Sequence, residues 1–323
     1  MSTDVKTTTP HIPIKAIRKK KIGIIHEIKS KWQLYLLLLI PVVYVLIFHY
    51  GPMYGIQIAF RNYNPVLGIS KSKWMGFAHF ERFFKSYQFW LLMKNTLGIS
   101  LYNLLVSTPI PIMLAICLNY LNHKFYKKTV QMVTYAPHFI STVVVVGILA
   151  QILSLRSGFV NNFIELLGGE RVNFMGIPGY FKSLYVWSGV WQEVGWGSII
   201  YLAALAGVDP QLHEAAIMDG ASKIKRIWHI DIPGILPTFI ILLILHVGKI
   251  MNVGFQKIYL MQNPMNLEAS EVIDTYVYTV GLNSGIPNYS YSTAIGLFKS
   301  VIALILIVSV NKIAKKVSET SLW

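Results

Sequence analysis

The sequence predicts an all-α integral membrane protein with six transmembrane helices, and two observations carry this prediction. Hydrophobic residues make up 54% of the 323 residues and charged residues only 13%, whereas soluble domains have roughly 25% charged residues. The apolar residues also form long runs, and a membrane-spanning helix needs roughly 20 consecutive apolar residues. Six segments meet this requirement: 33–50, 92–119, 130–154, 183–206, 236–256 and 291–312.

The first two segments need separate justification. A basic tail followed by the apolar run Gln33–Phe48 is the pattern of a signal peptide, but residues 49–54 offer no suitable small-residue cleavage site. We therefore expect the run to remain as the first span. The second segment contains Pro109 and Pro111. Each proline removes a backbone donor and clashes with the preceding turn, so we expect a kinked helix there.

Lysine and arginine are distributed unevenly between the segments. The tail 1–32 holds eight, and the loops 120–129 and 207–235 and the C-terminal tail hold three each. If six spans alternate, these stretches share one side of the membrane. The opposite side holds nine, in the longer segments 51–91, 155–182 and 257–290. The positive-inside rule therefore places both termini in the cytoplasm, with the two basic loops.

The net charge of +15 raises nucleic-acid binding as an alternative. The basic residues lie mostly at the N-terminus and in short loops, and no aromatic and basic stripe marks a nucleic-acid groove. Orientation in the membrane and attraction to anionic lipid headgroups explain the charge better. We expect membrane lipid as a partner and no nucleic acid.

The sequence contains none of the common catalytic or metal-binding motifs. There is no G-x-x-x-x-G-K-[ST] loop for phosphates, and no H-E-x-x-H, paired-cysteine or nucleophile-elbow pattern. Cys117, the single cysteine, lies in an apolar run and is expected to be a small buried hydrophobe. We therefore expect a chain that is not an enzyme and that binds no metal or cofactor itself.

The loop 207–235 is predicted to form two short helices. Asp209 followed by Pro210 is a helix start, because aspartate accepts a hydrogen bond from the first turn and proline is preset for that turn. Gly220 supplies a turn, and Ser222 can cap a second short helix. Pro233 is expected to close that helix before the next span.

Apolar residues in this loop, namely Ile227, Trp228 and Ile230, favour a protein partner site. A loop packed on its own spans is the alternative. Small alanines beside them would let another backbone come close. The relevant residues are Glu214-Ala215-Ala216, then Gly220, then Ile230-x-Ile232-Pro233.

This spacing resembles the EAA motif of ABC-importer permeases, in which E-A-A, three residues, G and nine residues precede I-x-L-P. Ile232 in place of leucine is the one departure. Three further stretches resemble sugar-uptake permeases, in particular the subgroup associated with complex polysaccharide fragments. They are Gly51–Tyr63, Lys94–Leu97 and Pro137–Ser141.

The resemblance implies a type I ABC importer permease core, with residues 33–323 as the six-span domain in a bacterial cell membrane. The implied partners are a second, similar permease, two ATPase subunits and an extracellular solute-binding lipoprotein. ATP and Mg²⁺ would be bound by the partner ATPase. The loop 207–235 would dock on that ATPase and couple its closure to the spans. The implied coupling residues are Glu214, Ala215, Ala216, Asp219 and Gly220.

Ionisable side chains inside spans point to a candidate substrate cavity, because they cost about 2.5–3.5 kcal/mol at the bilayer centre unless they face a cavity or a partner. For Glu193 and Lys249 we hypothesise an ion pair or a shared polar wall of the cavity. A purely structural pair is the alternative. Helical spacing aligns Leu242, His246, Lys249 and Val253. The candidate cavity residues are Thr142, Gly189, Glu193, Trp196, His246, Lys249 and Asn252.

Aromatic rings stack on sugar rings, while amides, imidazoles and charges bind hydroxyl groups. With the resemblance, this favours an oligosaccharide substrate, and Lys249 and the net charge are compatible with acidic, pectin-type fragments. An ABC permease for a non-sugar solute is one alternative. A secondary transporter driven by an ion gradient would usually show internal repeats, and a membrane enzyme acting on lipid-linked sugars would need clustered acids. Neither feature is evident.

Overall fold

The computed structural model describes residues 30–318. The chain divides into two compact units, Met1–Gly55 and Ile56–Trp323. The predicted basic tail 1–32 lies almost wholly outside the described residues, as does the end of the C-terminal tail.

The first unit contains the first predicted span. Helix α2 (Trp32–Val45) runs through a π-helical turn (Leu46–Tyr50) into α3 (Gly51–Met53). With the 3₁₀ turn that follows, the helical stretch Trp32–Phe60 has 29 residues. Its apolar residues occupy all sides of the helix, a pattern suited to a lipid environment.

In the described part of the second unit, residues 56–318, the regular structure is helical apart from one small ladder. Strands β1 (Arg61–Asn62) and β2 (Lys73–Trp74) pair antiparallel, with Arg61 opposite Trp74. The helices are α4 (Gly68–Lys71), α5 (Ala78–Lys85), α6 (Tyr87–Ser107), α7 (Pro109–Tyr120), α8 (Lys124–Tyr135), α9 (Thr142–Ile152), α10 (Phe159–Leu166), α11 (Pro178–Ala206), α12 (Pro210–Met218), α13 (Lys223–Arg226), α14 (Ile232–Gly248), α15 (Phe255–Met261), α16 (Leu267–Ser270), α17 (Ile273–Gly281) and α18 (Tyr289–Ser318).

Within the described residues, four helical stretches are long and apolar enough to cross a membrane, and one bent pair makes a fifth. Helix α11 adds 29 residues, about 43 Å at 1.5 Å per residue, against a hydrocarbon core of about 30 Å. These elements are compatible with the six predicted spans. The four stretches are Trp32–Phe60, Tyr87–Tyr120, Lys223–Gly248 and Tyr289–Lys316.

The third predicted span, 130–154, is wrong as a single helix. Its two halves, Lys124–Phe139 and Thr142–Ile152, meet at an angle of 102°. Pro137 lies in a 3₁₀ turn at the break, and Ser141 has an extended backbone and caps α9 by accepting from the Val144 amide at 3.4 Å. A new N-cap starts a new helix direction here, although the apolar run continues through it.

The fifth predicted span, 236–256, has different bounds. Helix α14 ends at Gly248, and the chain then turns, with the Asn252 amide donating to the Lys249 carbonyl at 2.7 Å. The apolar Ile250 and Met251 made the run look continuous. Ser100 of α6 donates to the Ile250 carbonyl, which ties this turn to the second span.

The second span is continuous in the structure, and the predicted disturbance at its prolines is the boundary between α6 and α7 at Thr108. Its N-terminal half is tied to the segment before α17. Asn95 donates to the carbonyls of Glu268 at 2.7 Å and Glu271 at 3.1 Å, and the Thr96 hydroxyl accepts from the Ile273 amide at 3.1 Å. Cys117, on the same span, is exposed, so its predicted burial is wrong.

Helices α8 and α11 pack unusually closely at Gly195. A Cβ atom at this position would lie 2.1 Å from the Thr134 carbonyl oxygen. Only glycine allows the two backbones to approach this far. The close crossing positions the bend after α8 against the middle of α11.

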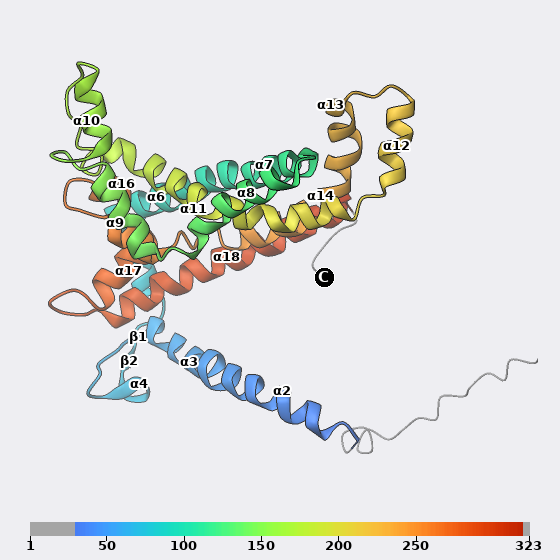
Figure 1. Ribbon diagram of the computed structural model, residues 1–323. Coiled ribbons are helices and arrows are strands. Elements are labelled where there is room, and N and C mark those ends of the chain that lie inside the picture. The colour runs from blue at the N-terminus through green and yellow to red at the C-terminus, as the bar shows by residue number, and fades with distance from the viewer. Residues whose placement is uncertain (1–29, 319–323) are drawn as a thin grey trace, which may run out of the picture. The chain divides into compact units, whose positions relative to one another are not determined.

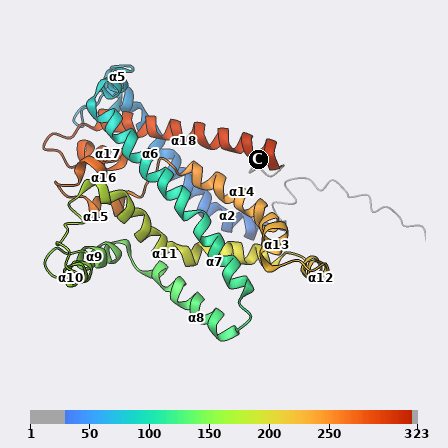
Figure 2. The ribbon, with the colours of Figure 1, turned by 90° about the horizontal axis from the view of Figure 1, so that it is seen from above.

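Within the second unit, α10 and the pair α12 and α13 lie at opposite ends of the long helices α11 and α14 (Figures 1 and 2). This arrangement agrees with the prediction that the segments 155–182 and 207–235 lie on opposite sides of the membrane. It separates two candidate surfaces, a coupling loop at one end and an exposed amphipathic helix at the other.

Candidate functional site

The first helix of the loop 207–235 has the predicted form. Asp209 caps α12, accepting a hydrogen bond from the Gln211 amide at 2.9 Å, and Pro210 occupies the first turn. Gly220 ends the turn after α12 with a φ of 74°, a left-handed conformation that favours glycine. The helix start and the turn were both predictable because each depends on local chemistry.

The second helix departs from the prediction. Ser222 caps α13 as expected, accepting from the Lys225 amide. Pro233 does not close it, because a π-helical turn (Ile227–Asp231) carries the chain from α13 directly into α14. Pro233 falls in the first turn of α14, where a residue without an amide hydrogen is tolerated.

The EAA residues form an accessible surface at the end of the bundle. Glu214, Ala215, Asp219 and Gly220 are exposed, and Ala216 is half-buried. Large apolar side chains surround them, and Met218 is 86% exposed. The other exposed apolar residues of the loop are Leu212, Ile217, Ile224 and Trp228. A surface of this kind suits a protein partner.

A cavity of about 860 Å³ lies among α6, α7, α11, α14 and the segment up to α15. This volume falls within the roughly 300–1,000 Å³ usual for ligand sites. Of the predicted residues, Thr142 is not part of its lining, and lies instead in the first turn of α9. The other six line it, namely Gly189, Glu193, Trp196, His246, Lys249 and Asn252.

The reason these residues meet differs from the predicted one. Leu242 and His246 lie on α14, whereas Lys249, Asn252 and Val253 follow its end. All five still face the same cavity because the turn folds back along α6. Helical spacing was therefore the wrong reason for a grouping that the structure contains.

The predicted ion pair between Glu193 and Lys249 is absent among the ion pairs of residues 30–318. Glu193 instead contacts His138, with its Oε2 2.9 Å from the histidine Nδ1. The His138 ring stacks on Trp196 at 4.4 Å between centroids. Glu193 and Lys249 thus share a polar wall and make no direct pair.

Lys257 is the main cavity residue that sequence reasoning missed. Its side chain is nearly buried, and its Nζ donates to the Tyr185 carbonyl at 2.9 Å and lies 4.8 Å from the Tyr185 ring centroid. The sequence placed Lys257 in an outer loop, so nothing indicated that α15 would bring it to Gly189. A cationic group in a stretch otherwise free of lysine and arginine was the only available signal.

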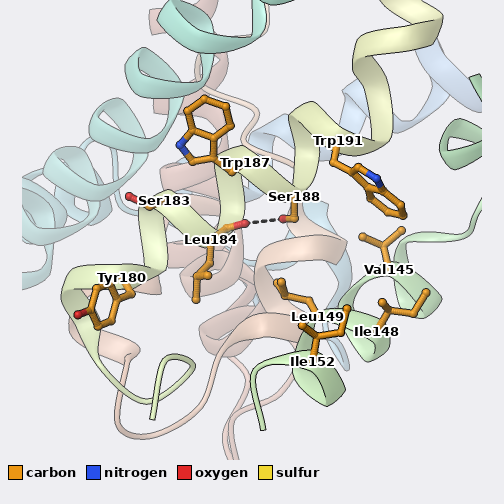
Figure 3. A pocket seen from close by; sticks show the side chains of 10 residues that line it. All are labelled: Val145, Ile148, Leu149, Ile152, Tyr180, Ser183, Leu184, Trp187, Ser188 and Trp191. Atoms are coloured by element: carbon orange, nitrogen blue, oxygen red, sulfur yellow. Dashed lines mark hydrogen bonds between the residues drawn. The ribbon is translucent and has the colours of Figure 1, made fainter. Parts of the chain in front are cut away.

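A second, smaller cavity of about 360 Å³ lies between α9 and α11 (Figure 3). Its lining is almost entirely apolar. Ser188, one of its two serines, donates its hydroxyl to the Leu184 carbonyl of its own helix. This cavity suits hydrocarbon and offers little to a sugar, so the larger cavity is the candidate passage.

Comparisons with known proteins point in one direction. The family described as "Binding-protein-dependent transport system inner membrane component" matches residues 107–319. The polygalacturonan/rhamnogalacturonan transport system permease protein YteP of Bacillus subtilis (strain 168) is 45% identical over 305 residues, which cover 94% of each chain. Protein LplB of the same organism is 45% identical over 295 residues, 91% of this chain and 92% of LplB.

Solved structures give the same result. A chain of the bacterial alginate ABC transporter, crystallised in complex with an alginate pentasaccharide-bound periplasmic protein, is 39% identical with a TM-score of 0.85. The match covers 93% of this chain and 99% of that chain. At this similarity the two chains share one fold.

Proposed function

Because the chain belongs to the family of binding-protein-dependent transport system inner membrane components, we propose that it is the permease of an ATP-driven importer for acidic oligosaccharides. The chain itself serves transport and not catalysis. In the proposed assembly a second permease completes the passage, two ATPase subunits drive it, and an extracellular binding protein delivers the substrate.

The charge of the larger cavity is the observation that carries the substrate class. Lys249 and Lys257 line it together with one carboxylate, Glu193, which His138 already contacts. The exposed Lys249 is therefore available for the carboxylates of uronic acid residues, and Lys257, whose Nζ donates to the Tyr185 carbonyl, adds a second cationic group to the wall. The names of the relatives, which refer to polygalacturonan and alginate, agree with this class.

Neutral features of the lining suit the sugar rings. Trp196 and Tyr185 present aromatic surface, while Gln192 and Asn252 bring amide groups to the wall. Aromatic surface and a few placed polar groups are the usual composition of such sites. A non-sugar solute would have less use for this combination.

The EAA surface supports the proposed ATPase contact and the proposed orientation. Glu214 and its neighbours lie on a rigid, capped helix with exposed apolar residues around it, at the end of the bundle that carries basic loops. Positive loops face the cytoplasm, where ATP is available. We therefore place both termini and α12 on the cytoplasmic side and α10 outside.

Transport by the whole complex tests the proposal. The permease, its companion, both ATPases and the binding protein are reconstituted in liposomes, with ATP on the ATPase side and no ion gradient. Trigalacturonate should be taken up only with ATP, and more efficiently than the neutral galactotriose. Uptake driven by an ion gradient without ATP would contradict the proposal that the importer is driven by ATP. A preference for galactotriose would overturn the acidic class alone.

Single cysteines test the contact and the orientation. Cys117 is exposed, so it is first replaced with alanine. Ala215→Cys should crosslink to an ATPase subunit, and Leu166→Cys on α10, where Leu166 is 81% exposed, should not. On intact cells an impermeant maleimide should label Leu166→Cys and leave Met218→Cys unlabelled until the membrane is opened. The reverse labelling would refute the orientation.

A further inference from the structure

A buried carboxylate joins the coupling loop to the spans. Asp231 is the last residue of the π-helical turn before α14 and is 0% exposed. Its Oδ2 accepts a hydrogen bond from the Tyr120 hydroxyl at 2.7 Å. Its Oδ1 lies 3.3 Å from Nε2 of His213 and makes no hydrogen bond to any described residue.

These three residues come from three different elements. His213 lies on α12, directly before the EAA sequence, and Tyr120 is the last residue of α7. Asp231 leads into α14. The Arg226 guanidinium lies 5.8 Å from the Tyr120 ring centroid and adds a positive charge beside the cluster. One carboxylate therefore touches the candidate coupling helix and also anchors the ends of two spans.

Both spans continue to the larger cavity. Pro111 of α7 and Leu242 of α14 line it. They lie nine and eleven residues from Tyr120 and Asp231, or about 14 and 16 Å along each helix. Each helix runs without a break from the cluster to these lining residues, so a shift of either anchored end displaces the cavity wall.

Separating a buried carboxylate from a polar partner is strongly unfavourable. A movement of α12 that withdrew His213 would break the 3.3 Å contact of Oδ1 with Nε2, and Oδ1 has no hydrogen bond that could replace this contact. Moving the cluster as one body therefore costs less. We propose that Asp231 is the positioning residue that transmits a displacement of α12 to α7 and α14, an inference that rests on the proposed function. Without this link, α12 could move while the cavity wall stays still.

A double variant separates transmission from folding. Asp231→Leu with Tyr120→Phe removes both polar partners, and such paired replacement by apolar groups can be nearly neutral for stability. The complete complex is reconstituted, and ATP hydrolysis and trigalacturonate uptake are measured in the same liposomes. We expect ATP hydrolysis within about twofold of the unmodified complex and uptake per ATP at least about tenfold lower. Tyr126→Phe, an exposed tyrosine on α8, is the matched control and should change neither.

A second readout follows the cavity wall directly. Leu242→Cys, in the chain with Cys117→Ala, is probed with a water-soluble maleimide before and after vanadate traps the ATPase. Trapping should change the labelling rate in the chain that retains Asp231 and Tyr120. It should leave the rate unchanged in the double variant. An unchanged ratio of uptake to hydrolysis, or an equal response of Leu242→Cys in both chains, would overturn the inference.

Tyr120→Phe alone keeps the inference testable if the double variant does not assemble. It deletes one oxygen atom, and we expect the same direction of change with a smaller size, roughly threefold in uptake per ATP. A proportional loss of hydrolysis and uptake, with less complex recovered, would show a merely structural role and refute transmission. If the unmodified complex itself shows no ATP-driven uptake, the proposed function fails, and that result is distinct from a failure of Asp231.

Discussion

His138 lies flat against Trp196, with ring centroids 4.4 Å apart and an angle of 3° between the planes. The same imidazole contacts Glu193 through Nδ1 at 2.9 Å. His138 comes from the bend between α8 and α9, whereas Trp196 and Glu193 lie on α11. The bend therefore fixes how an aromatic ring and a carboxylate are presented to the larger cavity.

Two replacements of His138 should separate its stacking on Trp196 from its contact with Glu193. His138→Ala loses both the stacked ring, about 0.5–1.5 kcal/mol, and the contact with Glu193, roughly 0.2–1 kcal/mol. Trigalacturonate uptake at low concentration should fall roughly tenfold, since 1.4 kcal/mol is a factor of ten. His138→Phe keeps a ring and should fall only about threefold. Initial rates per recovered complex check this, and equal losses in both variants would contradict it.

Removing the charge of Lys249 should affect acidic substrates selectively. Its side chain is exposed to the cavity, and an exposed charge pair contributes up to about 1 kcal/mol. Lys249→Gln should therefore raise the KM for trigalacturonate up to about fivefold and leave that for galactotriose unchanged. Lys94→Gln, on α6 outside the cavity lining, is the control. Equal effects on both sugars would show that Lys249 acts on the fold and not on the substrate charge.

The features that follow from local chemistry were predictable from the sequence. The apolar runs predicted an all-α membrane protein, and the EAA spacing predicted the type I ABC permease fold, which the similarity to the alginate transporter chain confirms. Asp209 and Gly220 fixed the ends of α12 because capping and a positive φ depend on neighbouring residues. Six of seven candidate cavity residues also line one cavity, but this grouping depends on the turn after α14 and not on the helical spacing that suggested it.

The features that depend on distant contacts were not predictable. Hydropathy cannot register the bend at Pro137 or the end of α14 at Gly248, because apolar residues continue on both sides. The contacts of Glu193 with His138 and of Lys257 with Tyr185 join segments 55 and 72 residues apart. The hypothesis of an ion pair placed Lys249 inside a span, whereas α14 ends at Gly248 and Lys249 lies beyond the helix.

Arg171 should hold the exposed helix α10 in place. Its guanidinium donates to the carbonyls of Leu155 at 2.9 Å and Arg156 at 2.6 Å, and to Glu165 Oε2 at 2.6 Å. Arg171→Lys cannot reproduce this planar set of donors, so several of these hydrogen bonds are lost together. Amide hydrogen exchange in residues 159–166 should become roughly tenfold faster. Arg156→Lys, in the same loop, should leave the exchange rate of α10 unchanged. Equal effects of the two variants would contradict the role of Arg171 in holding α10 in place.

The contact between Glu165 and Arg171 should also make α10 sensitive to acid. The hydrogen bond and charge of Arg171 hold the pKa of Glu165 below its ordinary 4.5. Because the pKa of Glu165 is lower in the folded state than in the unfolded state, the contact contributes fully to stability at pH values above the unfolded-state pKa. This contribution is lost as the pH falls through the folded-state pKa. The exchange rates of unmodified α10 and of Glu165→Gln should therefore differ at pH 7, by roughly twofold, and converge in acid. A difference that grows in acid would contradict this sign.

Gly195 provides the sharpest test of the packing that forms the cavity. A Cβ atom there would lie 2.1 Å from the Thr134 carbonyl oxygen, a backbone atom that cannot rotate away. Gly195→Ala must push α8 from α11, and overpacking of this kind costs about 1–3 kcal/mol or more. We expect a clearly lower melting temperature of the purified complex, and with it a loss of uptake, because the bend that carries His138 moves with α8.

Gly179 offers a matched control on the same helix, since a Cβ atom there meets nothing within 4 Å. Gly179→Ala should stay within about 0.5 kcal/mol of the unmodified chain, as is usual for substitutions away from packed contacts. The difference between the two variants isolates the close crossing from any general effect of alanine in α11. Equal melting temperatures for the two variants would mean that α8 and α11 are not in backbone contact in the assembled protein.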